Sequence, residues 1–117
     1  MNLKRKIKKI TVRFPQRLKN ELQIAIINSG YGCYGKSRWL KEAINVFLQQ
    51  PDFVEYVEHG IDINQAELSK VEAFYLDADT IQIMKEAFVK VRIAYPLFEG
   101  VQSALIRAAV VYSLMLK

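Results

Sequence analysis

The 117-residue chain has little of what disulfide frameworks, metal sites and hydrolytic centres are made from. It holds a single cysteine, Cys33, and a single histidine, His59. A disulfide framework needs paired cysteines and a zinc site needs several soft ligands, so the composition excludes both. The sequence also has no glycine-rich phosphate loop and no histidine paired with a nucleophile. We therefore expect no metal, no cofactor and no enzymatic activity.

Long apolar runs are missing as well. The most apolar stretch, residues 101–116, is short for a membrane span and carries Arg107 near its middle, so a buried helix explains it better. The basic start, residues 1–9, leads into an alternating segment and not into the apolar core of a secretion signal. We expect a cytoplasmic protein with no role at a membrane, built as one domain or as two small units that share a core.

Positive charge is concentrated in the first half of the chain. The whole sequence holds 17 Lys and Arg against 12 Asp and Glu, a net charge of +5. Residues 1–50 have a net charge of +9, whereas residues 51–117 have a net charge of −4. A polyanion would therefore be attracted to the first half.

The first half has the pattern of one strand followed by two helices. Residues 9–14 alternate between polar and apolar side chains, which predicts a half-buried strand. Its apolar face is Ile10, Val12 and Phe14, and its polar face is Lys9, Thr11 and Arg13. Pro15 ends the strand and suits the start of a helix, which should stop near Asn28-Ser29-Gly30, a sequence that accommodates a left-handed cap. A second amphipathic helix is expected after the glycine-containing turn, where Trp39 is predicted to pack in the core.

A similar pattern returns after a linker at residues 51–70, in which residues 51–59 have the composition of a short helix. Residues 71–76 are rich in strand formers, and Asp77 to Thr80 suit a helix N-terminus as caps and not as paired catalytic carboxylates. A shift of 66 aligns residues 37–44 with residues 103–110 and matches serine, alanine and the aliphatic positions. The sequence thus predicts two copies of one strand-helix-helix unit, in residues 1–50 and 71–117.

A single strand leaves a row of backbone donors and acceptors unpaired, so each predicted strand needs a partner. The simplest arrangement is a ribbon in which the two copies pair. The expected fold is mainly α with a short two-stranded antiparallel β-ribbon, covered on its apolar face by helices. Its polar face would point to solvent.

Two segments with the glycine-containing turn between them resemble the ribbon-helix-helix repressors of the Arc and MetJ type. These segments are Ile10-Thr11-Val12-Arg13-Phe14-Pro15 and Lys36-Ser37-Arg38-Trp39-Leu40-Lys41-Glu42-Ala43-Ile44. The resemblance covers nearly all of residues 7–50 and, with lower specificity, residues 71–116. Tandem units in one chain occur in accessory proteins of conjugative plasmid systems and T-DNA transfer, and this chain is similar to that arrangement. The implied fold is a tandem ribbon-helix-helix, with β-α-α repeated twice.

The resemblance also implies a site, because in that family the ribbon enters the major groove of double-stranded DNA. Base contacts are implied for Lys9, Thr11 and Arg13, whose donors and methyl group suit guanine and thymine edges. The resemblance implies phosphate contacts at the N-terminus of the second helix. Further phosphate contacts are expected from a basic arm at the start of the chain, formed by Lys4, Arg5, Lys6 and Lys8. The candidate phosphate-binding residues are Lys4, Arg5, Lys6, Lys8, Tyr34, Gly35, Lys36, Ser37 and Arg38. Ser37 is alternatively a cap or a first-turn residue, and Glu72 in the second strand would be repelled by phosphate.

These patterns give the hypothesis of sequence-specific DNA binding, in a transcriptional regulator or in a DNA-transfer accessory factor. The alternative is an antitoxin or adaptor whose acidic C-terminal half binds a protein partner. Two architectures also stay open. In one, the units pair within one chain as a pseudo-dimer, which a linker of about twenty residues favours. In the other, two chains pair their first units into a symmetric basic ribbon, and the acidic second units dimerise separately or bind a partner. Self-association of copies on DNA is a further expectation.

Overall fold

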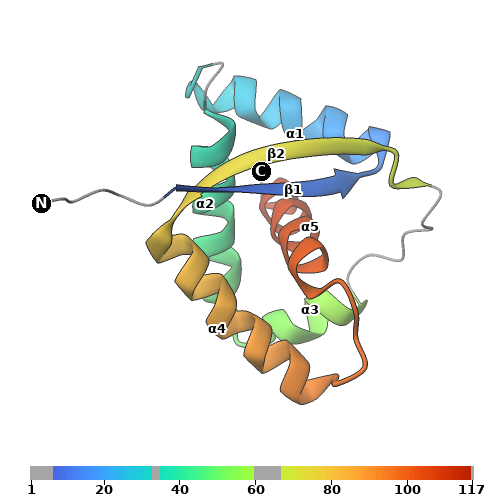
Figure 1. The fold of residues 1–117 in the computed structure, drawn as a ribbon. Helices are drawn as coiled ribbons and strands as arrows, with labels where there is room; N and C mark the ends of the chain where they lie inside the picture. Colours follow the sequence, from blue (N-terminus) through green and yellow to red (C-terminus); the bar gives the residue numbers. More distant parts are fainter. Residues whose placement is uncertain (1–6, 33–34, 60–66, 117) are drawn as a thin grey trace, which may run out of the picture.

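The computed structural model describes residues 7–32, 35–59 and 67–116, which form two strands and five helices (Figure 1). In chain order the elements are β1 (Ile7–Phe14), α1 (Gln16–Ser29), α2 (Lys36–Leu48), α3 (Phe53–His59), β2 (Lys70–Asp77), α4 (Ala78–Ala94) and α5 (Val101–Met115). The fold is mainly α with one two-stranded antiparallel sheet, as the sequence predicts. The short helix predicted before residue 60 is α3.

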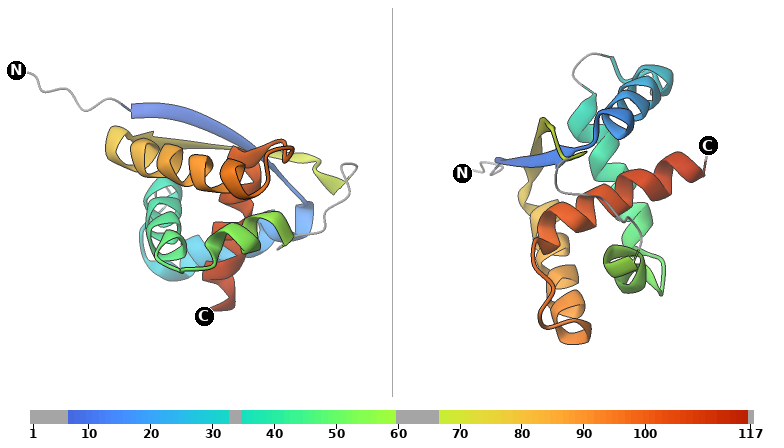
Figure 2. Two further views of the ribbon diagram at one scale, coloured as in Figure 1. Left: turned by 90° about the horizontal axis from the view of Figure 1, so that it is seen from below. Right: turned by 90° about the vertical axis from the view of Figure 1, so that its right-hand side faces the viewer.

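The two strands pair along their whole length. The register runs from Ile7 opposite Asp77 to Phe14 opposite Lys70. Directly opposed residues in an antiparallel pair lie on the same face of the sheet. In each strand the even-numbered residues therefore share one face and the odd-numbered residues share the other. The first face carries Lys8, Ile10, Val12 and Phe14 of β1 and Lys70, Glu72, Phe74 and Leu76 of β2. The second face carries Ile7, Lys9, Thr11 and Arg13 of β1 and Val71, Ala73, Tyr75 and Asp77 of β2. The helices lie on the side of the first face, and the second face points away from them (Figure 2).

The face toward the helices lies on the apolar core. Ile10, Val12 and Phe14 are buried, as the alternation predicts, and Phe74 and Leu76 from β2 are buried beside them. The rings of Phe14 and Phe74 meet edge to face with their centroids 6.2 Å apart. Below them α2 and α5 pack against each other more extensively than any other pair of helices.

Local signals set the ends of the helices in the first half. Pro15 is extended and directly precedes α1. Gly30 ends α1 with a φ of 79°, a conformation that glycine adopts without steric cost, which confirms the predicted cap. Trp39 lies in α2 and is buried, which confirms that it packs in the core.

The second half repeats several of these features. Asp77 precedes α4 and its carboxylate accepts a hydrogen bond of 2.9 Å from the backbone N–H of Thr80, which confirms the predicted cap. Each buried position of α2 has a buried counterpart 66 residues later in α5. These positions are Trp39, Leu40, Ala43, Ile44 and Phe47 in α2, and Leu105, Ile106, Ala109, Val110 and Ser113 in α5, which also buries Val101 and Ala108. The two helices thus bury their side chains with the same spacing.

α3 closes the lower side of the core. Phe53 and Tyr56 of α3 meet Phe47 of α2 edge to face, and Tyr56 also meets Tyr112 of α5. α3 is thereby held against both α2 and α5. Within the described ranges, every helix is too short or too polar to cross a membrane.

Candidate nucleic-acid interface

The outward side of the ribbon is where the predicted base-contacting residues lie. Lys9, Thr11 and Arg13 are exposed on β1, and their side chains alternate with the buried ones. They face β2 residues in three opposed pairs: Lys9 with Tyr75, Thr11 with Ala73, and Arg13 with Val71. We call these six side chains the ribbon face. It combines two cations and a hydroxyl on β1 with apolar and aromatic groups on β2.

Glu72 lies on the opposite side of the ribbon and not on the ribbon face. Its carboxylate is 3.0 Å from the Lys36 ammonium and 3.3 Å from that of Lys19. The Glu72 side chain is only 11% exposed. The sequence pattern did not predict this orientation, which removes the Glu72 carboxylate from the surface that would approach phosphate.

The N-terminus of α2 is partly engaged within the protein. The residue that precedes the helix is Gly35, and no side chain caps α2 among the described residues. Ser37 is a first-turn residue, and its hydroxyl accepts a 2.8 Å hydrogen bond from the backbone N–H of Tyr75. The Lys36 ammonium, besides its ion pair with Glu72, lies 5.4 Å from the centroid of the Phe74 ring. The side chains of Lys36 and Ser37 therefore hold α2 against β2, and the backbone amides of its first turn are the groups left for an anion.

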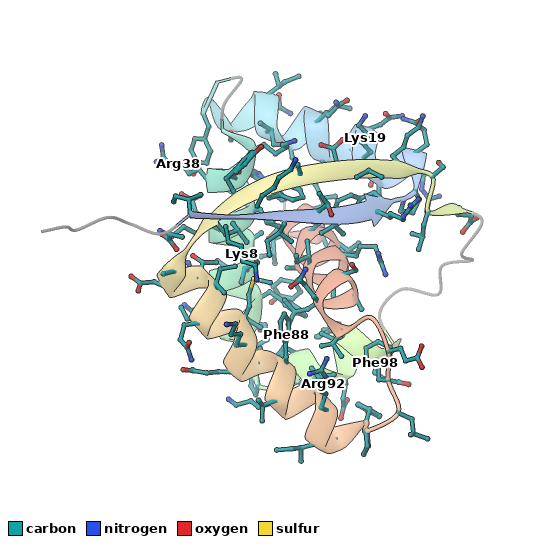
Figure 3. All side chains as sticks on the ribbon, viewed as in Figure 1. Lys8, Lys19, Arg38, Phe88, Arg92 and Phe98 are labelled. Atoms are coloured by element: carbon teal, nitrogen blue, oxygen red, sulfur yellow. The ribbon has the colours of Figure 1, made fainter. Side chains whose placement is uncertain are left out.

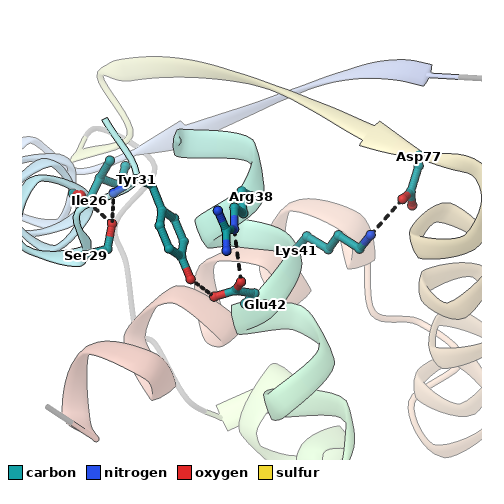
Figure 4. A network of polar contacts seen from close by, with 7 residues as sticks. All are labelled: Ile26, Ser29, Tyr31, Arg38, Lys41, Glu42 and Asp77. Atoms are coloured by element: carbon teal, nitrogen blue, oxygen red, sulfur yellow. Dashed lines mark hydrogen bonds and ion pairs between the residues drawn. The ribbon is translucent and has the colours of Figure 1, made fainter. Parts of the chain in front are cut away.

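Arg38 is the exposed cation at this end of α2, and a polar network fixes its position (Figure 4). Its guanidinium lies 4.0 Å from the centroid of the Tyr31 ring and 3.4 Å from a carboxylate oxygen of Glu42. The Tyr31 hydroxyl donates a hydrogen bond to the same carboxylate. That hydrogen bond raises the pKa of Tyr31 above its ordinary value. Arg38 is thus held beside the helix N-terminus with its side chain open to solvent.

The remaining candidates from the sequence lie at the N-terminal end or outside the described residues. Lys8 belongs to β1, which begins at Ile7 and not at the expected Lys9, so Lys8 is part of the ribbon and not of the arm. Its register places it on the side toward the helices, opposite Leu76, at an exposed end of the ribbon (Figure 3). Lys4, Arg5, Lys6 and Tyr34 lie outside the described residues.

A cleft of about 500 Å³ lies on the other flank, between β1 and the N-terminus of α5. Its polar lining includes Thr11, Arg13, Glu58, Glu99, Ser103 and Arg107. The Arg107 guanidinium donates a 3.0 Å hydrogen bond to the backbone carbonyl of Arg13, and partial burial lowers the pKa of Arg107. The sequence pattern did not mark Arg107 as part of a site, although a cation inside an apolar helix is a signal for such a contact.

Across the described parts of the chain, no group of His, Cys, Asp or Glu side chains is placed to hold a metal ion. No protein-family model, no curated protein and no solved structure matches this chain. The function is therefore inferred from the geometry and charge of the ribbon face and of the helix N-termini of α2 and α5 beside it.

Proposed function

We propose that the protein binds double-stranded DNA by placing the ribbon face in the major groove. The observation that carries the proposal is that Lys9, Thr11 and Arg13 project from a strand whose apolar residues are buried on its other side. None of the five described helices covers the surface that these three residues form. A B-DNA major groove is roughly 12 Å wide and admits a two-stranded ribbon. Arg and Lys donate to guanine O6 and N7, and a threonine methyl suits the methyl group of thymine.

The proposed architecture is a tandem ribbon-helix-helix in which the two units pair within one chain. A shift of 62 superposes the helix-facing residues of β1 on those of β2, and it also superposes the first residue of α1 on that of α4. The shift of 66 between the buried positions of α2 and α5 follows if the second unit is four residues longer between its strand and its last helix. Under this relation Thr11 and Ala73, which oppose each other, are equivalent positions at the centre of the ribbon.

Ion pairs between the two halves support pairing within one chain. Glu72 joins Lys19 and Lys36, and Asp77 joins Lys41 at 2.9 Å. Each pair links a cation of residues 1–50 with a carboxylate of residues 51–117. Part of the charge separation seen along the sequence is therefore used to hold the units together. The cations that stay exposed, Lys9 and Arg13 on the ribbon face and Arg38 in α2, are what a polyanion would meet.

Transcriptional regulation and assistance in DNA transfer use the same interface, so the proposal covers both. The test is fluorescence anisotropy of a labelled duplex that carries the DNA flanking the protein's own gene, with random-sequence duplex as competitor. Arg13→Ala is expected to weaken binding to the flanking DNA by about tenfold or more and to reduce discrimination against the competitor.

Arg92→Ala is the matched control, because Arg92 lies near the far end of α4, away from the ribbon (Figure 3). It removes the same charge and is expected to change affinity by about twofold or less. Equal losses in the two variants, or no binding of any duplex at low salt, would contradict the proposal. Lys6→Ala is expected to weaken binding to all duplexes alike.

A further inference from the structure

We infer that the DNA site is not palindromic and that the protein binds it in one orientation. This inference depends on the proposed function and adds the class of site that the ribbon face selects. It follows from two independent asymmetries, one on the ribbon face and one on its flanks.

The first asymmetry lies in the residues that the two strands present. Rotation by half a turn about an axis through the Thr11–Ala73 pair exchanges position 9 with position 71 and position 13 with position 75. In a ribbon made of two identical chains, exchanged positions would hold the same residue. Here the rotation puts Val71 where Lys9 was and Tyr75 where Arg13 was. The ribbon face therefore has no two-fold symmetry in its chemistry.

The chemical difference between the strands selects different base edges. Lys9 and Arg13 present donors that suit the acceptors of guanine, whereas Val71 and Ala73 present methyl groups that suit thymine. Val71 is 54% exposed and Tyr75 is 55% exposed, so both reach the surface beside the cations. Paired strands lie about 4.8 Å apart, so one groove would meet both kinds of side chain together.

An inverted repeat offers the same base edges to both ends of the ribbon. One end of this ribbon presents Lys9 beside Tyr75, and the other presents Arg13 beside Val71. Two identical half-sites would therefore suit one end and mismatch the other. A mismatched base pair typically costs enough free energy to weaken binding by about tenfold.

The second asymmetry lies at the helix N-termini that flank the ribbon. The first turn of α2 contains Lys36, Ser37 and Arg38, whereas the aligned residues of α5, 66 positions later, are Gln102, Ser103 and Ala104. The cleft at the α5 end is lined by Glu58 and Glu99 together with Arg13 and Arg107. At the α2 end Arg38 is an exposed cation where the aligned position of α5 is Ala104, which favours phosphate beside α2 and gives the duplex a preferred orientation.

The test is selection by the full-length protein from a pool of duplexes with a randomised central segment. The expected result is an enriched motif without inverted-repeat symmetry. Replacing one half of that motif with an inverted copy of the other half is expected to weaken binding by about tenfold. An enriched inverted repeat, or binding of duplexes without any enrichment, overturns the inference. Failure to bind any duplex contradicts the proposed function itself.

A variant that makes the ribbon face symmetric tests the cause. Val71→Lys, Ala73→Thr and Tyr75→Arg together place the side chains of β1 at the equivalent positions of β2, and circular dichroism checks that the triple variant folds. Its enriched motif is expected to become an inverted repeat. Tyr75→Ala alone, at an exposed position, is expected to relax base preference only at the end where Lys9 lies. Motifs identical to that of the wild type in both variants would show that β2 does not contact bases.

Discussion

The hydroxyl of Ser37 accepts a hydrogen bond from the backbone N–H of Tyr75, at an O–N distance of 2.8 Å. This bond joins the first turn of α2 to the outer edge of β2, which has no third strand beside it in the described sheet. At the other edge, Arg107 of α5 donates to the carbonyl of Arg13 in β1. A helix from each half of the chain thus makes one hydrogen bond to the outer edge of the strand of the other half.

Ser37→Ala is expected to lower the free energy of unfolding by about 1 kcal/mol, because it removes the hydrogen-bond partner of the Tyr75 amide. Urea denaturation measures the change. Ser103→Ala is the control, since Ser103 holds the aligned position in α5 and its substitution changes helix propensity equally. The assignment is wrong if the two variants lose the same stability.

Glu72→Gln is expected to destabilise the protein by about 1–2 kcal/mol. Its carboxylate is 11% exposed and pairs with two lysines that are themselves partly exposed, so the loss lies between that of a surface pair and that of a buried pair. Thermal unfolding at low and at high salt measures this loss of stability. The difference in melting temperature between the variant and wild type should shrink in high salt, because salt screens the ion pairs. Glu21→Gln, at an exposed position of α1, is the control and should be close to neutral. A loss no greater than the control's would show that the ion pairs between the halves contribute nothing.

Asp77→Asn tests the charge at the start of α4 while keeping an acceptor for the cap. The hydrogen bond from Lys41, followed by that from Thr80, holds the pKa of Asp77 well below its usual range. A carboxyl whose pKa is lower in the folded state than in the unfolded state stabilises the protein at pH values above its pKa in the unfolded chain, about 3.9. This stabilisation is lost as the pH falls toward the pKa of the folded state. Wild type is therefore expected to be more stable than the variant at pH 6, with the difference shrinking below about pH 4. Urea unfolding across this range decides the matter, and a difference that does not change with pH would rule out the ionised carboxylate as its source.

Phe74→Leu tests whether the two halves unfold together. Phe74 is fully buried against Phe14, and its truncation is expected to cost about 1–2 kcal/mol. Trp39, the only tryptophan, lies in α2 of the first half and reports on that half by fluorescence. Its unfolding midpoint should shift together with the midpoint from circular dichroism. Separate transitions, with the Trp39 midpoint unchanged, would mean that the halves are independent.

Strong local patterns predicted much of the fold. Strict alternation assigned the two faces of β1, Gly30 marked the end of α1, and Asp77 marked the start of α4. Each of these depends on neighbours in the sequence or on one residue with a special backbone role. The outward orientation of Lys9, Thr11 and Arg13 followed from the same alternation.

The faces of β2 and the ion pairs were not predictable in this way. Phe74, Tyr75 and Leu76 are three consecutive bulky residues without alternation, and their orientation follows only from the register with β1, where Phe74 opposes Ile10. Glu72 finds its partners 36 and 53 positions earlier in the chain, at Lys36 and Lys19. Such distant contacts leave no periodic signal. Ser37 was a candidate for phosphate binding, and its hydrogen bond to β2 needed the tertiary fold.

The central claim is that the ribbon face is the surface that binds duplex DNA. Amide chemical-shift mapping of the ¹⁵N-labelled protein, titrated with the DNA flanking its own gene, tests this claim most directly. The account predicts the largest shifts at Lys9, Thr11, Arg13 and Ala73 and in the first turn of α2, with little change in α3 and the last turns of α4. Large shifts in α3 and the end of α4, with the ribbon unchanged, would contradict it.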